Sequence, residues 1–574
     1  MVVLVTSPWL GDVTKSGVLD WDVETAHRYL VTLSLRRYGE MPFWNPFACG
    51  GFPAWGYIEG APTLVSPWLL PYLALPIMAA VRLEVIGMGL LGAVGAYAMA
   101  GQLTRSAPAR ALVVALWAVN GRWALQAAAG HTWHLAYALM PWCFYFFERA
   151  RADRGRFAPL FGLAVMFAML VYGGGIYPLP HTVLALGLYA LTLVVLERSP
   201  SPLAPLVISG GLAFGLAAPK LWPMLVTFAR SPRLVDSTEW LDVHAFLTLL
   251  TSRDQGMTSS PVHLPYGWHE NGMYISVVGV VVLVVACACV WGRRESALKL
   301  VGLVFVALGF GAFGRMAPWS LLHAHAPFFG SQHVPTRFLY PAVLLLSVVA
   351  ASGLGRVLER WPRLEIVAAV VVLGLAVDVA RVARVPMTQT MKLAPAAIDA
   401  DPVFHFDETA HNAVHDRRLQ ASGYLAMRSN RGVIACYGVP TLAAIGARSV
   451  TDPRYRGEAY VETMNAGDTP VAARIVEWSP NHAVVTLDAA APGSFVVYNM
   501  NFDQGWRSDA GPVVSRDDKV AVRMDEPRAR VTFTYRPPYF TAGLLVCILT
   551  LAASAAVFWR ERARRSSPPA RASA

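Results

Sequence analysis

Two aspartates, Asp20 and Asp22, lie one residue apart in a polar stretch of an otherwise apolar N-terminal region. A free aspartate has a pKa of about 3.9, so either carboxylate is ionised at neutral pH and able to accept or orient a proton in a reaction. Asp22 also precedes Val-Glu-Thr-Ala, a pattern typical of a helix start that an aspartate caps. We therefore predict that one of Asp20 and Asp22 is catalytic, and the order of the two stays open.

The spacing Asp20-Trp21-Asp22 also matches a metal-binding pair of acids. Two such carboxylates could hold Mg²⁺ or Mn²⁺ against a phosphate. Two acids alone do not specify a metal site, and metal dependence stays open.

A second informative segment, Trp44-Asn45-Pro46 followed by Gly50-Gly51, combines aromatic, amide, proline and glycine residues. Proline fixes φ and glycine permits tight turns, so we predict a shaped loop. Trp44 and Asn45 could contact a substrate. For Trp44 the favoured alternative is an interfacial anchor, since tryptophan is enriched where membranes meet water.

Arg337 is the best candidate for binding an anionic group such as phosphate, because it follows a proline-bounded loop and enters an apolar helix. Its guanidinium could bind phosphate bidentately, and a helix N-terminus favours anions. Arg122 lies inside an apolar segment, where a charge is a functional hypothesis by default. It could meet a phosphate or pair with Asp20 or Asp22; the alternative is that it reaches the interface along its alkyl stem.

Five further residues are weaker candidates. His131 and His134 share a helix face and could be metal ligands, phosphate donors or interfacial polar residues. Lys220 could bind phosphate, as could Arg230 and Arg233. For the last three the alternative is ordinary loop charge.

The elements that position these residues are mostly membrane helices. The chain has 574 residues, of which 55% are hydrophobic and 15% charged, against about 25% charged in a soluble protein. A bilayer-spanning helix needs about 20 apolar residues, and we predict about 11–12 transmembrane helices. The predicted spans are a fragment at 1–10 that lacks its beginning, then 84–103, 109–128, 133–150, 157–175, 180–197, 203–222, 272–292, 297–314, 337–355, 363–383 and 540–560.

The net charge of +11 comes from basic residues in short loops between apolar segments. This distribution orients a membrane protein and does not indicate nucleic-acid binding. With the basic loops in the cytoplasm, loops 11–83, 223–271 and 315–336 and the large segment 384–538 face outward. The apolar segment 61–80 contains four prolines, so we expect a broken or interfacial helix there.

Residues 384–538 are predicted to form a separate, β-rich domain. From about residue 471, five runs alternate as strands do, and Ser-Pro-Asn, Ala-Pro-Gly and similar turn signals separate them. The division is thus a membrane domain 1–383, a β-sandwich-like domain 384–538, a last transmembrane helix 539–560 and a basic tail 561–574. Tyr498, Trp506 and Tyr535 could form a ligand platform or the core of this domain. Cys49 and Cys436 lie outside the spans, and whether they pair stays open.

Four segments in order resemble the YfhO-like bacterial membrane proteins, which belong with the GT-C glycosyltransferases. They are the acidic pair with Gly39 to Pro46 and Gly50-Gly51, the stretch His131 to His134 before Pro141-Trp142, the stretch Pro327 to Phe338, and Gly505-Trp506 with Tyr535 to Gly543. Such proteins often carry a basic residue where His333 stands here.

This resemblance implies an enzyme that moves a sugar from a polyprenyl-phosphate donor to a glycan, glycolipid or protein of the cell envelope. It also implies an acid in the first outer loop as base, and an active site and β-domain on the outer face of the bacterial cytoplasmic (inner) membrane. The alternatives are a transporter or flippase of lipid-linked sugars and a non-catalytic scaffold. A transporter would show inverted repeats and polar residues in broken midplane helices, whereas polarity here gathers in the loops.

Overall fold

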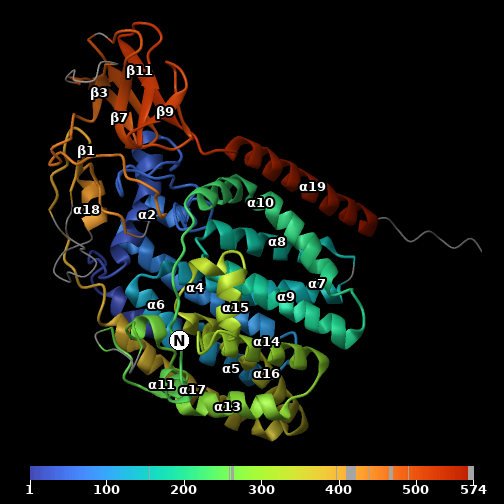
Figure 1. The fold of residues 1–574 in the computed structure, drawn as a ribbon. Helices are drawn as coiled ribbons and strands as arrows, with labels where there is room; N and C mark the ends of the chain where they lie inside the picture. The colour runs from blue at the N-terminus through green and yellow to red at the C-terminus, as the bar shows by residue number, and fades with distance from the viewer. Residues whose placement is uncertain are drawn as a thin grey trace, which may run out of the picture.

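The computed structural model describes residues 1–153, 155–257, 259, 264–395, 397–408, 422–437, 440–463, 470–488 and 490–566. A helical body carries a β-rich domain at one end (Figure 1). The predicted tail beyond residue 566 lies outside the described residues. The protein is a polytopic α-helical membrane protein, as its composition predicts.

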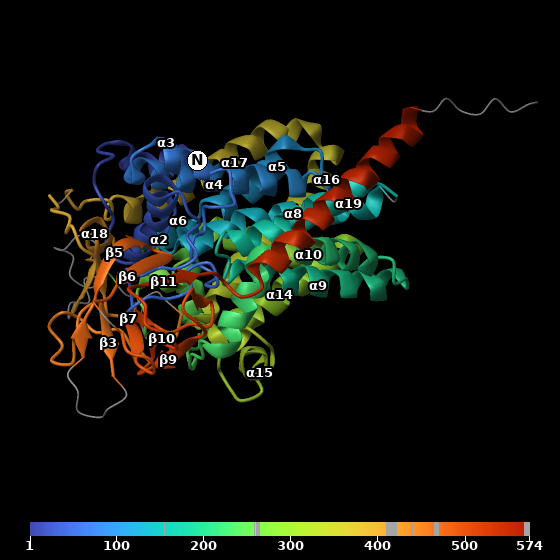
Figure 2. The ribbon, with the colours of Figure 1, turned by 90° about the horizontal axis from the view of Figure 1, so that it is seen from above.

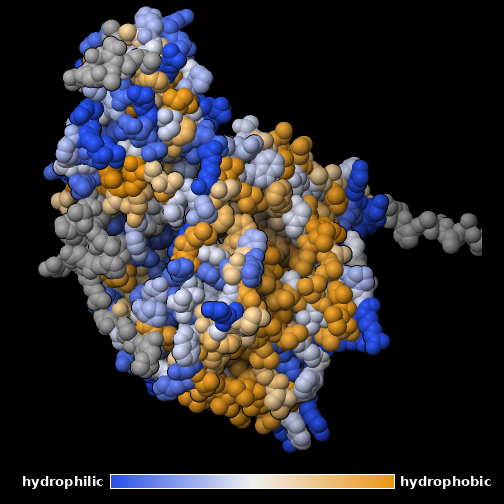
Figure 3. All heavy atoms as spheres, in the orientation of Figure 1, coloured by the Kyte–Doolittle hydropathy of each residue, from blue (hydrophilic) through white to orange (hydrophobic). Residues whose placement is uncertain are grey.

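Within the described residues, seven helices are long and apolar enough to cross a membrane. They are Ile77–Ala100 (α4), Pro178–Glu197 (α9), Leu203–Arg230 (α10), Trp268–Cys289 (α12 and α13), Pro335–Arg360 (ending in α16), Pro362–Met387 (ending in α17) and Phe540–Arg565 (in α19). On the face shown in Figure 3, hydrophobic side chains gather over the helical body and hydrophilic ones over the β-rich domain. The last helix, α19, packs along α10, and both ribbon views show it there (Figures 1 and 2).

The other helices are shorter. The α-helices among them are α1 (Val2–Thr6), α2 (Trp21–Leu33), α3 (Leu69–Ala74), α5 (Ala107–Val113), α6 (Gly121–Ala129), α7 (Met140–Ala152), α8 (Phe157–Tyr172), α11 (Val243–Thr251), α14 (Arg293–Gly309), α15 (Pro318–His325) and α18 (Ser422–Arg428). Within the long segments, α12 is Trp268–Asn271, α13 Ser276–Cys289, α16 Leu339–Arg360, α17 Glu365–Met387 and α19 Phe540–Ser566. The 3-10 and π segments are η1 (Ser7–Leu10), η2 (Ser34–Tyr38), η3 (Val114–Ala118), η4 (Thr132–Leu139), η5 (Phe329–Ser331), η6 (Pro335–Phe338) and η7 (Pro362–Leu364).

Two predicted spans are interrupted. Segment 109–128 passes through a π turn and breaks before α6, where the Asn120 side chain caps the new helix by accepting from the Trp123 amide. Segment 133–150 begins as a 3-10 helix and becomes α-helical only at Met140. Segment 61–80 holds only the six-residue α3 before α4 begins at Ile77, as its prolines predict.

The C-terminal domain contains two antiparallel sheets, as its alternating runs predict. One has the order β4-β3-β7-β10-β9 and the other β5-β6-β11-β8. Their strands are β3 (Ala459–Glu462), β4 (Val471–Ala472), β5 (Arg474–Ser479), β6 (His482–Thr486), β7 (Phe495–Asn501), β8 (Trp506–Ser508), β9 (Val513–Arg516), β10 (Lys519–Arg523) and β11 (Arg530–Tyr535). A small parallel pair, β1 (His405–Asp407) and β2 (Arg431–Val433), precedes them. Apolar side chains of both large sheets share one buried core.

The first polar loop is built into that core. Trp44, Phe47 and Phe52 belong to the same buried cluster as the inner faces of the two sheets. The Asn481 side chain accepts from the Trp44 amide at 2.9 Å and donates to the Met41 carbonyl at 2.6 Å. The loop and the C-terminal domain therefore form one packed unit, although more than 400 residues separate them in sequence.

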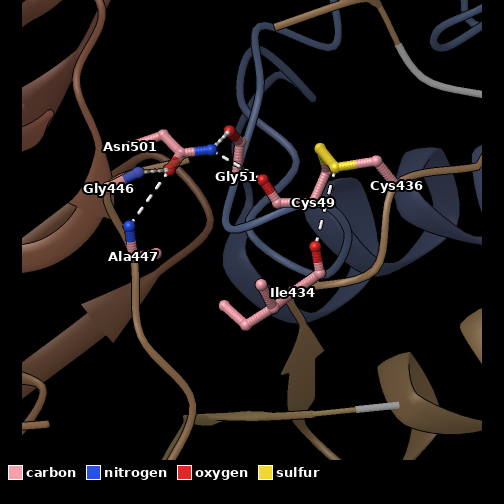
Figure 4. Close-up of a disulfide and its surroundings, with 7 residues drawn as sticks. All are labelled: Cys49, Gly51, Ile434, Cys436, Gly446, Ala447 and Asn501. Carbon is pink, nitrogen blue, oxygen red and sulfur yellow. Dashed lines mark hydrogen bonds between the residues drawn. A yellow bond between two sulfur atoms is a disulfide. The ribbon is translucent and has the colours of Figure 1, made fainter. Parts of the chain in front are cut away.

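A disulfide joins the same two regions. Cys49 is bonded to Cys436, with 4.4 Å between their Cα atoms (Figure 4). Nearby, the Asn501 side chain donates to the carbonyls of Cys49 and Gly51 and accepts from the amides of Gly446 and Ala447 (Figure 4). The sequence left the pairing of these cysteines open, and the structure decides it.

Candidate active site at the first polar loop

Asp20 is placed by the end of α6. Asp20 donates its amide to the Ala129 carbonyl at 3.0 Å, and the Trp21 indole donates to the carbonyls of Ala127 and Ala128. These bonds satisfy carbonyls that a helix end leaves unpaired. Gly130 ends α6 with a φ of +90°, and a Cβ there would lie 2.3 Å from the Trp21 nitrogen. Glycine thus permits the close approach that sets Asp20 beside the next residue, His131.

The carboxylate of Asp20 has two partners from distant parts of the chain. Its Oδ2 lies 3.0 Å from His131 Nε2, and its Oδ1 accepts from the Tyr437 hydroxyl at 2.8 Å. Burial acts to raise the pKa of Asp20, but the hydrogen bond and charge of His131, together with the Tyr437 hydrogen bond, lower it. The side chain of Asp20 is 26% exposed, so an ionised oxygen is held where a substrate can reach it.

His131 has the hydrogen-bond pattern of an imidazolium. Its Nδ1 lies 3.0 Å from Gln126 Oε1, an acceptor, because the amide nitrogen of Gln126 donates to the His269 carbonyl. Its Nε2 faces the Asp20 carboxylate, so both ring nitrogens meet acceptors. Burial lowers the pKa of His131, but the carboxylates of Glu270 and Asp20 outweigh it and raise that pKa. The acceptors at both ring nitrogens and the raised pKa of His131 favour its charged form beside the Asp20 carboxylate.

Asp22 has a different task. Its carboxylate accepts from the amides of Gly423 and Tyr424 at 3.2 and 3.0 Å, in the first turn of α18. The sequence predicts that one of the two acids caps a helix. Asp22 does so, but it caps α18 and not α2, the helix to which it belongs. In the contacts described here, the two carboxylates have different partners.

We expect Asp22→Ala to loosen α18 from α2. Losing a cap destabilises a helix by about 1 kcal/mol, so amide exchange within residues 422–428 should quicken by about fivefold. Hydrogen exchange followed by mass spectrometry measures this. Asp525→Ala, at an exposed turn, is the matched control. Unchanged exchange in α18 would contradict the capping role.

Arg337, the candidate anion-binding residue, is buried and paired with a carboxylate. Its Nη2 lies 2.6 Å from Glu270 Oε2, and its guanidinium carbon lies 4.6 Å from the Trp133 ring centre and 4.2 Å from that of Tyr177. Only 5% of its side chain is exposed. Glu270 also lies 3.8 Å from His131 Nε2, which links this pair to Asp20. The positive charge of Arg337 is therefore balanced by the Glu270 carboxylate.

Arg122 organises the backbone around that pair. It is fully buried and donates to the carbonyls of Glu270, Asn271 and Thr336. These bonds tie α12 to the residues before α16. Its contacts among the described residues do not include either aspartate of the acidic pair, and its buried side chain does not reach an exposed interface. The third possibility, a contact with a phosphate, stays a prediction.

The other candidate cations and imidazoles also have defined environments. His134 is buried between Tyr137 and Tyr340, with ring centres 4.9 and 4.6 Å away. Lys220 is buried in α10 and donates to the Gly60 carbonyl at 2.6 Å. In the same helix, Pro223 has no amide hydrogen to donate to the Pro219 carbonyl. The Trp55 indole donates to that carbonyl instead, at 2.7 Å.

Trp44 and Asn45 shape the loop. Trp44 is 1% exposed, and its ring centre lies 5.3 Å from Trp506 and 4.7 Å from Tyr535. Asn45 accepts from the Phe47 amide at 2.9 Å, which forms an Asx turn. Tyr498 is buried in the same cluster, so these aromatic residues form core rather than an open platform.

An apolar groove of about 430 Å³ lies close to this region. Side chains of α9 and α10 line part of it, among them Val183, Leu184 and Leu225. Tyr57 of the first loop and Pro440 and Thr441 of the C-terminal domain line it as well.

Arg233 is the one charged residue among the described residues that line the groove. It lies near enough to Tyr437 to act electrostatically on the phenol that is bonded to Asp20. The groove and the Asp20 carboxylate therefore belong to one region of the molecule.

Among the described residues, no group of three or more His, Cys, Asp or Glu side chains is arranged to hold a metal ion. The sequence missed Tyr437, Glu270 and Gln126 as members of the site. Glu270 had one usable signal, because it is a lone acid directly before the apolar segment 272–292 and can complement Arg337. Tyr437 had none, since only the tertiary structure brings it to Asp20.

No known protein family matches the sequence, and no curated protein matches it either. A solved structure that resembles it is the cryo-EM structure of the arabinofuranosyltransferase AftD from Mycobacteria, with 17% identity and a TM-score of 0.42. The match covers 67% of this chain and 26% of that one. A likeness at this level does not identify a reaction, and membership of the YfhO-like proteins stays a prediction.

Proposed function

We propose that the protein is a membrane glycosyltransferase of the GT-C type. It moves a sugar from a polyprenyl-phosphate donor to an acceptor hydroxyl of the cell envelope, at the outer face of the bacterial cytoplasmic membrane. The observation that carries the proposal is that the two aspartates of the acidic pair have different contacts. Asp22 is used as a helix cap, whereas Asp20 stays partly exposed and ionised between His131 and Tyr437.

In the proposed step, the acceptor oxygen attacks the anomeric carbon of the donor sugar. The bond from that carbon to the phosphate oxygen breaks, and polyprenyl phosphate leaves as an anion with the bonding electrons. Asp20 takes the proton of the acceptor hydroxyl. Arg233, half-buried at the apolar groove, supplies positive charge for the leaving phosphate, and the groove holds the first isoprene units.

The outer-face location is supported by the Cys49–Cys436 bond, which joins the polar loop to the C-terminal domain. Disulfides persist in oxidising compartments and are rare in the cytosol. The basic loops predict the same orientation.

The direct test is to incubate the purified protein with a synthetic polyprenyl-phosphate sugar and envelope acceptors and to measure both products. Sugar in the acceptor fraction and free polyprenyl phosphate should appear in equal amounts. Movement of intact donor across vesicles, with no free polyprenyl phosphate, would instead indicate a transporter and refute the proposal.

We expect Val183→Trp, within the groove, to raise KM for a long-chain donor by about tenfold. The indole displaces roughly two methylene groups of lipid, each worth about 0.8 kcal/mol when buried. A donor with a very short chain should be affected less. Val195→Trp is the control on the same helix, because Val195 is 74% exposed and lies outside the groove lining. Equal KM values in the two variants would rule out the groove as the lipid site.

A further inference from the structure

We infer that Tyr437 is a positioning residue for Asp20, brought from the C-terminal part of the chain and fixed there by the Cys49–Cys436 disulfide. The inference rests on the proposed role of Asp20 and deepens it. The site would then be composite: the membrane domain supplies the carboxylate and His131, and the C-terminal part supplies the hydroxyl that holds the second carboxylate oxygen.

The first step of the argument is the geometry of the carboxylate. The backbone amide of Asp20 is bonded to the end of α6, but the Asp20 side chain does not cap α2, the helix that follows it. Two side-chain contacts orient it, one from His131 to Oδ2 and one from Tyr437 to Oδ1. With both in place the plane of the carboxylate is fixed; with either removed it can rotate about its last torsion, which is broad and roughly two-fold.

The second step is how Tyr437 is held. The residue before it, Cys436, is bonded to Cys49. Two backbone bonds run alongside, from the Cys49 amide to the Ala435 carbonyl at 3.2 Å and from the Gly50 amide to the Val433 carbonyl at 3.1 Å. The Asn501 side chain in turn holds the loop that carries Cys49, by donating to the carbonyls of Cys49 and Gly51 (Figure 4). Tyr437 therefore stands at the end of a braced segment, although 44% of it is exposed.

The third step is the charge around the pair. Tyr437 donates to the ionised form of Asp20 and so favours it, which contributes to the lowered pKa of that carboxyl. The other titratable or charged groups that act on Asp20 or Tyr437 are Glu24, His131, Arg233, His269 and Glu270. Tyr437 and Asp20 are both partly exposed, at 44% of the residue and 26% of the side chain.

The test is Tyr437→Phe, which removes the hydroxyl and keeps the ring. Without the donated hydrogen bond the pKa of Asp20 rises, so the acid limb of the pH–rate profile should move to higher pH by about one unit. The rate at neutral pH should fall by about tenfold because the carboxylate is less well oriented. Tyr455→Phe is the matched control, since Tyr455 donates to Glu458 in the same domain, away from Asp20.

A second readout does not depend on catalysis. A carbodiimide reacts with protonated carboxyl groups, so the pH at which the Asp20 peptide is half-labelled reports the pKa of Asp20. This pH should be higher in Tyr437→Phe than in the wild type, and unchanged in Tyr455→Phe. The Cys49→Ser/Cys436→Ser double variant should shift in the same direction as Tyr437→Phe.

The outcomes separate the inference from the function it rests on. A wild type that transfers no sugar refutes the proposed reaction, whereas the labelling still measures the effect of Tyr437 on Asp20. Sugar transfer with superimposable profiles and labelling curves for wild type and Tyr437→Phe would overturn the role of Tyr437. A double serine variant that behaves as the wild type would overturn the part of the disulfide.

Discussion

Asp20→Asn is expected to lower kcat for sugar transfer by about 10²–10⁴-fold, the range that a general base contributes. Asparagine has nearly the same shape and can still accept from Tyr437, but it cannot take a proton at neutral pH. The measurement is kcat with a polyprenyl-phosphate sugar in detergent or vesicles, with binding of the donor followed separately.

Asp22→Asn is the matched control for this prediction. Its carbonyl oxygen can still cap α18, so kcat should stay within about threefold of the wild type, because asparagine and aspartate cap helices about equally well. The two variants make the same chemical change two residues apart. If Asp22→Asn were the inactive one and Asp20→Asn active, the assignment of the base would be wrong. Equal, full activity in both would remove the acidic pair from the mechanism.

Arg28→Met is expected to reduce the free energy of unfolding by about 3–5 kcal/mol, because it leaves two carboxylates buried without their cation. Arg28 donates to Glu84 from Nε at 2.7 Å and from Nη2 at 3.1 Å, and to Glu24 from Nη1 at 2.8 Å. The side chains of Arg28 and its two partners are at most 9% exposed. This network joins α2 to α4.

Thermal unfolding in detergent, followed by the loss of monodisperse protein, measures the effect. Arg530→Met is the control: Arg530 pairs with Glu477 at 2.6 Å, but both side chains are more than half exposed, at 56% and 59%. An exposed pair contributes about 0–1 kcal/mol, so this variant should unfold almost as the wild type does. Similar losses of stability in the two variants would show that the buried Arg28 network stabilises the fold no more than an exposed ion pair does.

The secondary structure of the C-terminal domain illustrates what local pattern can predict. The five alternating runs became β5, β6, β7, β10 and β11, because period-two alternation reflects one buried and one exposed face of a strand. Strands β3, β4, β8 and β9 are at most four residues long and were missed, since so few residues carry too little periodicity to detect. In the same way, a run of apolar residues predicted helix at 109–128 but not the break that the Asn120 cap marks.

The sequence by itself determined the membrane class, the β-rich C-terminal domain, the broken segment 61–80 and the presence of an ionisable pair at Asp20 and Asp22. Each of these depends on composition or on a repeat between near neighbours. Only the tertiary structure decided that Asp22 caps a distant helix, that Arg337 is neutralised by Glu270, and that Tyr437 meets Asp20. These contacts join residues 67 to 417 positions apart. Apart from the lone acid Glu270 before its apolar segment, nothing local in the chain indicates which polar groups the folded core brings together.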